Sequence, residues 1–359
     1  MASSTADQIA GPGGRSRGKP AHASRTDLRY QMEHTEPLAA VSSDVYYQSG
    51  YWNDFPEVAA EINRRISGKP DRDYLAHFLA RIGERRFSRA LFLNCGSGWV
   101  ERDFLARGVV ESAVGIDYSD DLLDRARKAA RDLPIRYVQL DVNHGELPDD
   151  AFDLVVNYAA GHHIARLDRV FRALCRRMTH DAWFVSYDYV GAHRNQYSYE
   201  QWSAVWELNN ALPADGRQAL AYPHLPTMMH TDPSEAVHSE LILETFRRYF
   251  AVQDYRPVGG ALAYPLLTFN RSLLAMDEPR RRPIVSEIMD ADRRFLDEHP
   301  QLTQFAYWCG RPRHDTLADH LMLDRWKREE TAREEAAAAA GGRYYGRTLL
   351  ESLIYPQET

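Results

Sequence analysis

The chain is organised around residues 90–100, which read Ala-Leu-Phe-Leu-Asn-Cys-Gly-Ser-Gly-Trp-Val. The apolar first part, Ala90 to Leu93, predicts a strand that is buried on both faces. Small residues follow, and a predicted helix then runs from Trp99 to Arg107 and stops at Gly108. Small residues between a strand and a helix allow a ligand to approach the backbone N–H groups at the helix N-terminus. The stretch therefore predicts a strand, a turn and a helix that together hold a ligand.

An acidic residue stands at the end of the next predicted strand. That strand covers 109–116, and Asp117 follows it. The acid comes about twenty residues after the glycines, a spacing at which a carboxylate reaches the hydroxyls of a ribose. Turn and acid together predict a cofactor that carries a nucleoside. A nicotinamide dehydrogenase is the alternative, but its G-x-G-x-x-G pattern needs a glycine where Glu101 stands.

Beyond Asp117, predicted strands and helices alternate, with Ser119 as the N-cap of the next helix. This alternation predicts an α/β fold, with a Rossmann-like, seven-stranded, mostly parallel sheet and helices on both faces. Ligands of such sheets collect at the carboxyl ends of the strands. A helical pattern over 62–87 precedes the sheet. The further strands are expected at 135–140, 152–159, 182–189, 250–258 and 304–310, and the helices at 119–132, 167–178 and 239–249.

The chain is expected to divide into three parts. Residues 1–40 have little to bury and predict a disordered tail. The folded domain is expected over 41–312, and two insertions, at about 192–237 and 260–301, would form a cap over the ligand. A charged helix and an apolar tail are expected over 313–359, with a homodimer contact as the alternative to a solvated helix surface.

The composition excludes several classes. The 359 residues are 44% hydrophobic, which allows a sizeable core. Acids outnumber bases by 51 to 44, so no basic field favours nucleic acid or an acidic membrane. The three cysteines are far apart, which argues against a disulfide framework and fits a reducing cytoplasm. No apolar run approaches the roughly 18 residues of a membrane span, so a cytoplasmic protein is expected.

Four motifs resemble those of the class I S-adenosylmethionine-dependent methyltransferases. They are Leu-Phe-Leu-Asn-Cys-Gly-Ser-Gly at 91–98, Val-Gly-Ile-Asp at 114–117, Gln-Leu-Asp-Val at 139–142 and Phe-Asp-Leu-Val-Val-Asn at 152–157. The likeness covers roughly residues 45–312. It implies S-adenosylmethionine as the cofactor.

The resemblance assigns cofactor contacts residue by residue. The turn would hold the methionine part, the acid after the second strand the ribose, and the next acid and its neighbour the adenine. Two residues at the end of the fourth strand would line the floor beside the sulfonium. The residues implied are Asn94, Gly96, Gly98, Asp117, Tyr118, Asp141, Val142, Asn157 and Tyr158.

Two positions depart from the family pattern. Phe92 stands where the family usually has an acid that anchors the amino group of the cofactor, and Asn94 stands where it has glycine. Asparagine tolerates positive φ better than other side chains, so the turn is expected to survive. An aromatic segment over 45–52 could compensate for the missing acid, since rings favour a nearby cation. Tyr51 and Trp52 are accordingly predicted cofactor contacts, with core packing as the alternative.

Histidines follow the fourth strand, close to the expected position of the methyl group. A hydroxyl acceptor must lose a proton, and histidine is suited to this near neutral pH. His162, His163 and Asp188 are therefore the catalytic candidates, with a structural role as the alternative. The acceptor-binding candidates are Tyr189, His193, Arg194 and Glu235. No metal site is expected, because the spacing of His224, His230, Asp232 and Glu235 matches no standard ligand pattern.

These observations favour methyl transfer to a small molecule. A weaker likeness, from residues 188–191 through 232–236, is to methyltransferases of sugar and secondary-metabolite pathways, including antibiotic biosynthesis. O-methylation of such a hydroxyl is the favoured function. N-methylation of an amine or amino acid is the nearest alternative, and a non-catalytic binding or assembly protein is a further one.

Overall fold

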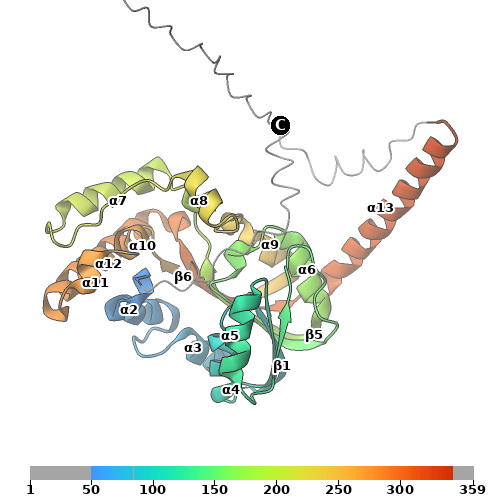
Figure 1. The fold of residues 1–359 in the computed structure, drawn as a ribbon, viewed down its shortest axis with the longest axis horizontal. Coiled ribbons are helices and arrows are strands. Elements are labelled where there is room, and N and C mark those ends of the chain that lie inside the picture. Colours follow the sequence, from blue (N-terminus) through green and yellow to red (C-terminus); the bar gives the residue numbers. More distant parts are fainter. Residues whose placement is uncertain (1–49, 84, 343–359) are drawn as a thin grey trace, which may run out of the picture. The chain divides into compact units, whose positions relative to one another are not determined.

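A computed structural model of the protein describes residues 50–83 and 85–342 (Figure 1). The expected disordered tail, the aromatic residues 45–49 and the apolar segment 343–359 lie outside the described residues. The described residues group as one unit. Within the described chain, no helix combines the length and the apolar character that crossing a membrane requires.

The described residues form one sheet of seven strands, as the sequence predicts. Its order is β3-β2-β1-β4-β5-β7-β6. The first five strands are parallel, and β7 runs antiparallel between β5 and β6. The strands are β1 (Phe87–Leu93), β2 (Val110–Asp117), β3 (Ile135–Gln139), β4 (Phe152–Tyr158), β5 (Met178–Tyr189), β6 (Phe250–Gly259) and β7 (Phe305–Pro312).

Helices connect the strands and cover both faces of the sheet (Figure 1). Ser119 caps α5 as predicted, because its hydroxyl accepts a hydrogen bond from the backbone of Leu122. The helices between the strands are α4 (Trp99–Ala106), α5 (Asp120–Ala130), α6 (Leu167–Arg177) and α9 (Ile242–Tyr249), with short 3-10 turns η3 (Gly161–His163), η4 (His193–Asn195) and η5 (Ser239–Leu241).

The helical stretch before the sheet is divided, which corrects the single pattern read over 62–87. After the turn η2 (Trp52–Asp54), α2 (Pro56–Ser67) ends at Gly68, whose φ of 79° is left-handed. A second helix, α3 (Tyr74–Ile82), begins after the N-cap Asp73. Phe87 already belongs to β1.

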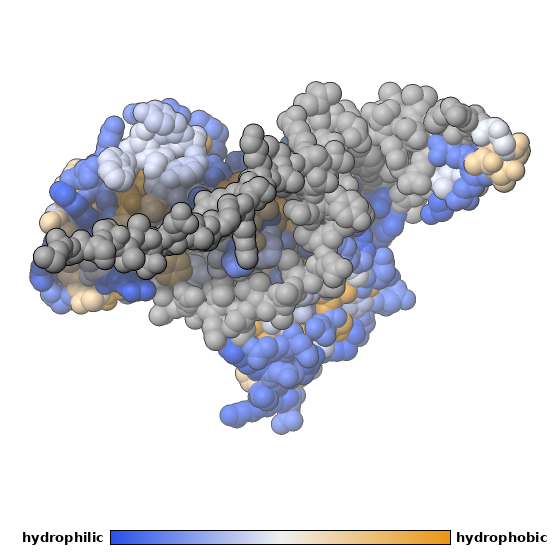
Figure 2. Space-filling model, turned by 45° about the horizontal axis from the view of Figure 1, so that its top comes forward, coloured by the Kyte–Doolittle hydropathy of each residue, from blue (hydrophilic) through white to orange (hydrophobic). Residues whose placement is uncertain are grey.

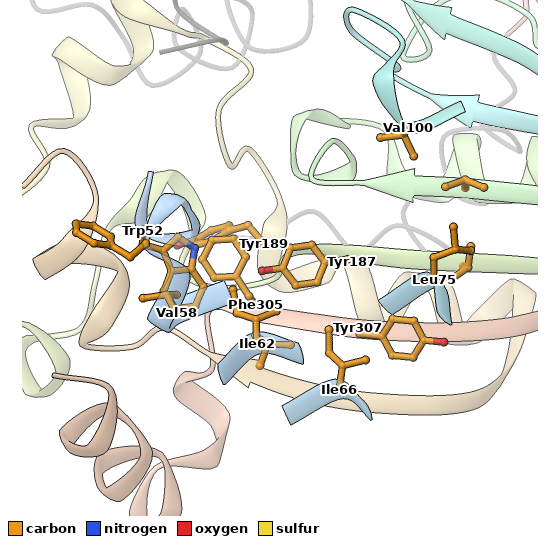
Figure 3. Packing of buried hydrophobic residues seen from close by; sticks show 14 of the residues in the cluster. Trp52, Val58, Ile62, Ile66, Leu75, Val100, Tyr187, Tyr189, Phe305 and Tyr307 are labelled. Atoms are coloured by element: carbon orange, nitrogen blue, oxygen red, sulfur yellow. The ribbon is translucent and has the colours of Figure 1, made fainter. Parts of the chain in front are cut away.

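The two faces of β1 enter two different clusters of buried residues. Ala90 and Phe92 pack on one side of the sheet, and Leu91 and Leu93 on the other. This confirms the prediction of a strand buried on both faces. Figure 3 shows part of the first cluster, in which side chains of α2 lie beside aromatic side chains of β5 and β7.

The two expected insertions contribute helices beside the sheet. The first holds α7 (Tyr199–Ala211) and α8 (Leu225–Thr231), and the second holds α10 (Ala263–Leu267), α11 (Arg271–Ala275) and α12 (Glu278–Glu298), followed by η6 (Pro300–Leu302). α10 contacts both α7 and α12, and α12 contacts α2 (Figure 1). We call residues 192–237 and 260–301 the cap. The charged helix α13 (Asp315–Ala339) follows β7. In Figure 2, hydrophilic residues dominate the visible surface, with smaller hydrophobic areas between them.

Candidate active site

The turn after β1 has the backbone that the sequence predicts. Asn94, Gly96 and Gly98 all have positive φ, of 43°, 57° and 75°. Asparagine thus takes the left-handed conformation here, as expected. Its side-chain amide also donates a hydrogen bond to the carbonyl oxygen of Ala160 at 3.0 Å, which ties the turn to the end of β4. The turn opens directly into α4, so the first amides of that helix are available to a ligand.

Asp117 links this turn to the start of α5. Its carboxylate is 8% exposed and accepts hydrogen bonds from the backbone N–H of Gly96 at 2.7 Å and of Ser119 at 2.8 Å. Burial raises the pKa of Asp117, and these two amides oppose that rise. The acid is therefore held at the end of β2, directly beside the turn.

The second acid stands at the end of the neighbouring strand. Asp141 accepts a hydrogen bond from the backbone of Asn143 at 2.9 Å and pairs with His144 at 2.6 Å. The side chain of Asp141 is 29% exposed, and Val142 beside it is buried. Tyr118 is partly exposed at the end of β2. The predicted ribose and adenine contacts are thus carried by adjacent strands.

The aromatic compensation for Phe92 stays a prediction. Phe92 is buried against Phe104, with ring centroids 5.2 Å apart. Trp52 is 2% exposed and packs on Phe305 with centroids 5.0 Å apart (Figure 3), so its ring is a core side chain. Tyr51 is partly buried, and burial together with the charges of Glu235 and Asp232 raises its pKa.

The end of β4 supplies a polar and an aromatic side chain. The amide of Asn157 donates to Asp188 at 2.6 Å and lies 2.7 Å from the hydroxyl of Ser186. The ring of Tyr158 meets Trp99 of α4 edge to face at 5.1 Å and stacks on Tyr187 at 5.5 Å. Both predicted floor residues therefore lie at the carboxyl end of the sheet, and Tyr158 contacts the first residue of α4.

Asp188 is a buried acceptor that holds several groups in place. Its carboxylate has no exposed surface. It accepts hydrogen bonds from the side chain of Asn157, from the backbone of Gly161 and Tyr189, and from Nδ1 of His162, at 2.6–2.7 Å. Its proposed catalytic role is thus one of positioning rather than of direct contact with the acceptor.

His162 and His163 lie side by side in η3, with ring centroids 4.2 Å apart. Nδ1 of each ring is hydrogen-bonded. Asp188 bonds Nδ1 of His162, and the Ser234 hydroxyl bonds Nδ1 of His163 at 3.0 Å. The Nε2 atoms lie 3.7 Å and 3.9 Å from the same carboxylate oxygen, Oε2 of Glu235. We call His162, His163 and Glu235 the two-histidine cluster.

The cap brings Glu235 to the histidines through main-chain contacts. The backbone N–H of Val237 donates to the carbonyl of His162 at 3.2 Å, and that of Arg194 donates to Ala236 at 2.7 Å. The guanidinium of Arg194 also reaches the carbonyl oxygen of Glu235 at 3.2 Å.

Strained backbone flanks these contacts. Ala159, Arg194 and Ala236 have positive φ of 49°, 53° and 48°. Such conformations are costly for residues with side chains and concentrate at functional sites. The sheet end and the cap segment are therefore held in an unfavourable backbone state where they meet.

The polar groups of two acceptor candidates have partners of their own, although the ring of Tyr189 also meets that of His162 at 6.1 Å. The Tyr189 hydroxyl lies 3.0 Å from the carbonyl of Ala192 and 2.8 Å from the side chain of Gln304. His193 pairs with Glu240 of η5 at 3.1 Å. The structure thus brings Arg194 and Glu235 to the histidines, and gives Tyr189 and His193 partners of their own.

The two-histidine cluster is electrostatically coupled. Burial lowers the pKa of His162, but the charges of Asp188 and Glu235 outweigh it and raise the pKa to about 10. Burial and the neighbouring charge of His162 lower the pKa of His163. Burial raises the pKa of Glu235, but the histidines and Arg194 bring it down to about 2. At neutral pH, one histidine and the carboxylate therefore form an ion pair.

The sequence did not indicate this juxtaposition. In the described part of the chain, the donor atoms of the cluster lie within 4.8 Å of one another, although Glu235 is remote in sequence from the histidines. His224, which sequence reasoning grouped with Glu235, instead pairs with Thr227 on α8 at 2.8 Å. The repeated pair His162-His163 at a strand end is the signal that could have found half of the cluster.

Comparison with known proteins matches the central part of the chain to a family. Residues 91–186, which span β1 to β5, match the family described as methyltransferase domain. These residues form a class I S-adenosylmethionine-dependent methyltransferase domain. The match covers the turn, both strand-end acids and the histidine pair, at the positions where the sheet order places the ligand edge.

Relatives share part of this methyltransferase domain. The chain is 38% identical over 74 residues to an uncharacterized methyltransferase of Mycobacterium bovis and to two of Mycobacterium tuberculosis. The match covers 21% of this chain and only 36% of the length of those relatives.

Solved structures are also similar. An S-adenosylmethionine-dependent methyltransferase from Mesorhizobium loti is 21% identical with a TM-score of 0.40, and the match covers 63% of this chain and 91% of that one. Phosphoethanolamine N-methyltransferase 2 of Haemonchus contortus is 14% identical with a TM-score of 0.44, and the match covers 76% and 60%.

The residues present fit S-adenosylmethionine, the cofactor of this domain. The left-handed Gly98 has no room for a Cβ, which would meet Tyr137, Glu101 and Ala126. The close turn therefore requires glycine. Asp117 and Asp141 supply carboxylates at successive strand ends. The turn would hold the amino-acid part of the cofactor, and the two acids its nucleoside.

Replacing Asp117 with asparagine is expected to weaken binding of S-adenosylhomocysteine by about 10- to 100-fold. A hydrogen bond to a charged acceptor is worth about 1.5–3 kcal/mol, and an amide cannot accept with both of its atoms. Isothermal titration calorimetry measures the affinity. Asp120→Asn, at an exposed acid in the first turn of α5, is the control. Equal affinities of the two variants would refute the ribose role of Asp117.

Proposed function

We propose that the protein is a methyltransferase that transfers a methyl group from S-adenosylmethionine to a hydroxyl of a small, sugar-like or secondary-metabolite acceptor. The observation that carries this proposal is the two-histidine cluster, in which Glu235 of the cap lies within 4 Å of the Nε2 atoms of both histidines. It lies past β4, at the strand ends where the methyltransferase domain binds its cofactor.

The chain's own residues have distinct parts in this reaction. When bound, the cofactor supplies an electrophilic methyl group, and the chemistry of transfer is its own. The protein must align the acceptor, exclude water and assist the loss of the hydroxyl proton. The cap covers the sheet end and excludes water. Asp188 orients His162, and Ser234 orients His163, so that both imidazoles face the acceptor side.

N-methylation of an amine is the second candidate, and a specific observation supports it. Burial raises the pKa of four tyrosines, and the negative charge of Glu235 adds to each rise. A carboxylate among aromatic rings is a favourable site for an ammonium group. These tyrosines are Tyr51, Tyr189, Tyr197 and Tyr264.

The test uses S-adenosylmethionine labelled in its methyl group. The protein is incubated with a panel of polyhydroxylated compounds and a panel of primary amines, and transferred label is counted. Label on a hydroxyl compound is the expected result, and label only on amines would establish the second candidate. A protein that binds neither S-adenosylmethionine nor S-adenosylhomocysteine in calorimetry would be a binding or assembly protein instead.

Removal of either imidazole is expected to lower turnover by about 100-fold or more. His163, whose pKa is lowered, is the imidazole that can take a proton, and the charged His162 holds Glu235 beside it. His162→Ala and His163→Ala are compared with His230→Ala, which changes an exposed histidine of α8. Affinity for S-adenosylhomocysteine should stay within about threefold in all three variants. Near-normal turnover in both cluster variants would remove the histidines from the mechanism.

A further inference from the structure

We infer that His162, His163 and Glu235 bind a divalent transition-metal cation, and that this cation receives the oxygen of the acceptor. The inference rests on the proposed function for its role, but not for the binding site itself. It goes against the sequence-based expectation of no metal site, which examined Glu235 with His224, His230 and Asp232 but not with the two histidines of the cluster.

The donor set is one that transition metals prefer. Two imidazole nitrogens and one carboxylate oxygen, with further positions open, suit divalent zinc, iron, cobalt or manganese. Within the described residues, the three donor atoms lie within 4.8 Å of one another. The oxygen of Glu235 is 3.7 Å and 3.9 Å from the two Nε2 atoms.

These distances are close to those of a bound site. With metal–ligand bonds of about 2.1 Å, two ligands on one cation are about 3–3.5 Å apart. The Glu235 oxygen, at 3.7 Å and 3.9 Å from the two Nε2 atoms, therefore needs to approach each of them by less than about 1 Å. The side chain of Glu235 is 28% exposed and that of His163 is 19% exposed, so an ion can reach the donor atoms from solvent.

A second, independent observation is the hydrogen bond at Nδ1 of each histidine ring. Histidines that bind metals generally donate their other ring N–H to a carboxylate or another acceptor. Asp188 accepts from Nδ1 of His162 at 2.6 Å. The Ser234 hydroxyl lies 3.0 Å from Nδ1 of His163, and that hydroxyl is itself bound to Asp232 at 2.7 Å. Both rings are thus fixed with Nε2 directed toward Glu235.

The charge around the cluster also favours a divalent ion. Asp188, Asp232 and Glu235 are carboxylates, and Arg194 is the guanidinium that contacts the Glu235 backbone. With both histidines uncharged, these groups leave two negative charges. A divalent cation neutralises them, which lowers the cost of burying the carboxylates.

With a cation bound, the two histidines would act as its ligands rather than as the base, and the cation would take the acceptor hydroxyl as a further ligand. Binding to a cation lowers the pKa of an oxygen-bound proton, as it does for metal-bound water. The hydroxyl proton would leave to solvent water, and the oxygen would keep the electron pair with which it attacks the methyl carbon. The metal is neither oxidised nor reduced.

The experiment measures binding of cobalt(II) alone to the untagged protein after removal of metals with a chelator. The expected result is one equivalent bound per chain, with visible absorption bands. His163→Ala and Glu235→Gln should each lose cobalt affinity by at least 10-fold. Ser234→Ala should lose about 10- to 100-fold, because it removes the hydroxyl that orients the His163 ring. His230→Ala is the matched control and should bind as the wild type does.

Circular dichroism and thermal melting establish that each variant is folded, and Glu235→Gln keeps the shape of the side chain. Absence of saturable cobalt binding, or equal affinity in the cluster variants and His230→Ala, would overturn the site. Turnover that is unchanged after chelation would overturn the cation's role in the reaction. Cobalt binding without any affinity for S-adenosylhomocysteine would instead leave the metal site standing and refute methyl transfer.

Discussion

Replacing Asp188 with alanine is expected to lower the free energy of unfolding by about 3–5 kcal/mol and turnover by about 1000-fold or more. The carboxylate is fully buried and accepts from Asn157, Gly161, His162 and Tyr189. Its removal leaves these buried donors unpaired, and breaking a buried charged network costs this much. Turnover falls further because His162 loses the acceptor that fixes its ring, and loss of an orienting aspartate costs about 10⁴-fold in a serine protease.

Urea unfolding measures the stability change, and transfer of labelled methyl measures turnover. Asp181→Ala is the control, since this acid lies on the same strand but keeps 63% of its side-chain exposure beside Arg85. Asp188→Asn separates the two effects. It keeps the shape and should restore part of the stability. One oxygen of Asp188 accepts from His162 and Tyr189 and the other from Asn157 and Gly161, so the amide nitrogen leaves one of these pairs without an acceptor. The charge that faces His162 is also removed, so turnover should stay low. Full turnover in Asp188→Asn would contradict the positioning role.

The sequence predicted most of the sheet, the turn after β1 and the positions of two acids at strand ends, because these depend on local patterns. The apolar run before Asn94, the acids Asp117 and Asp141 at strand ends, and the positive φ of Asn94 all follow from neighbouring residues. The number of strands and their mostly parallel order follow from the alternation of elements, and both are confirmed.

The two-histidine cluster could not be predicted in the same way. Its third member depends on the path of the cap, which is fixed by long-range contacts such as the hydrogen bond from Val237 to the carbonyl of His162. No periodic pattern in the sequence predicts that the cap brings Glu235 back to the histidines. The acceptor roles of Tyr189, the last residue of β5, and of His193 stay predictions. Their polar groups pair with Gln304 and Glu240, which sequence position alone did not indicate.

The burial of Glu101 is a second feature that the sequence did not indicate. Glu101 stands where a dinucleotide-binding pattern would have its third glycine, in the first turn of α4. The structure buries it completely. Among the described residues, neither of its carboxylate oxygens has a hydrogen-bond partner, and the same holds for the nearby hydroxyl of Tyr137. Burial is costly for a charged carboxyl, and it raises the pKa of Glu101 from 4.5 to about 7 against the opposing effects of Tyr137, Arg102 and Cys95.

This raised pKa predicts that Glu101 destabilises the protein at alkaline pH. Between pH 4.5 and 7 the folded state binds more protons than the unfolded state, so the stability contribution falls as pH rises through this window. Above pH 7 the difference between 4.5 and about 7 amounts to about 3 kcal/mol of lost stability. Glu101→Gln carries no charge and escapes the penalty. The variant should therefore be about 3 kcal/mol more stable than wild type at pH 8.5 and nearly equal to it at pH 4.5.

Urea unfolding of both proteins at the two pH values measures this difference. Glu111→Gln removes an exposed acid of β2 and should change stability little at either pH. A stability difference between Glu101→Gln and wild type that does not vary with pH would show that Glu101 is ionised in the folded protein at no cost. Because Glu101 lies beneath Gly98, the same variant also reports on the turn: S-adenosylhomocysteine should bind it at pH 8.5 at least as tightly as it binds the wild type, since the amide leaves no buried charge to loosen α4 where it meets the cofactor.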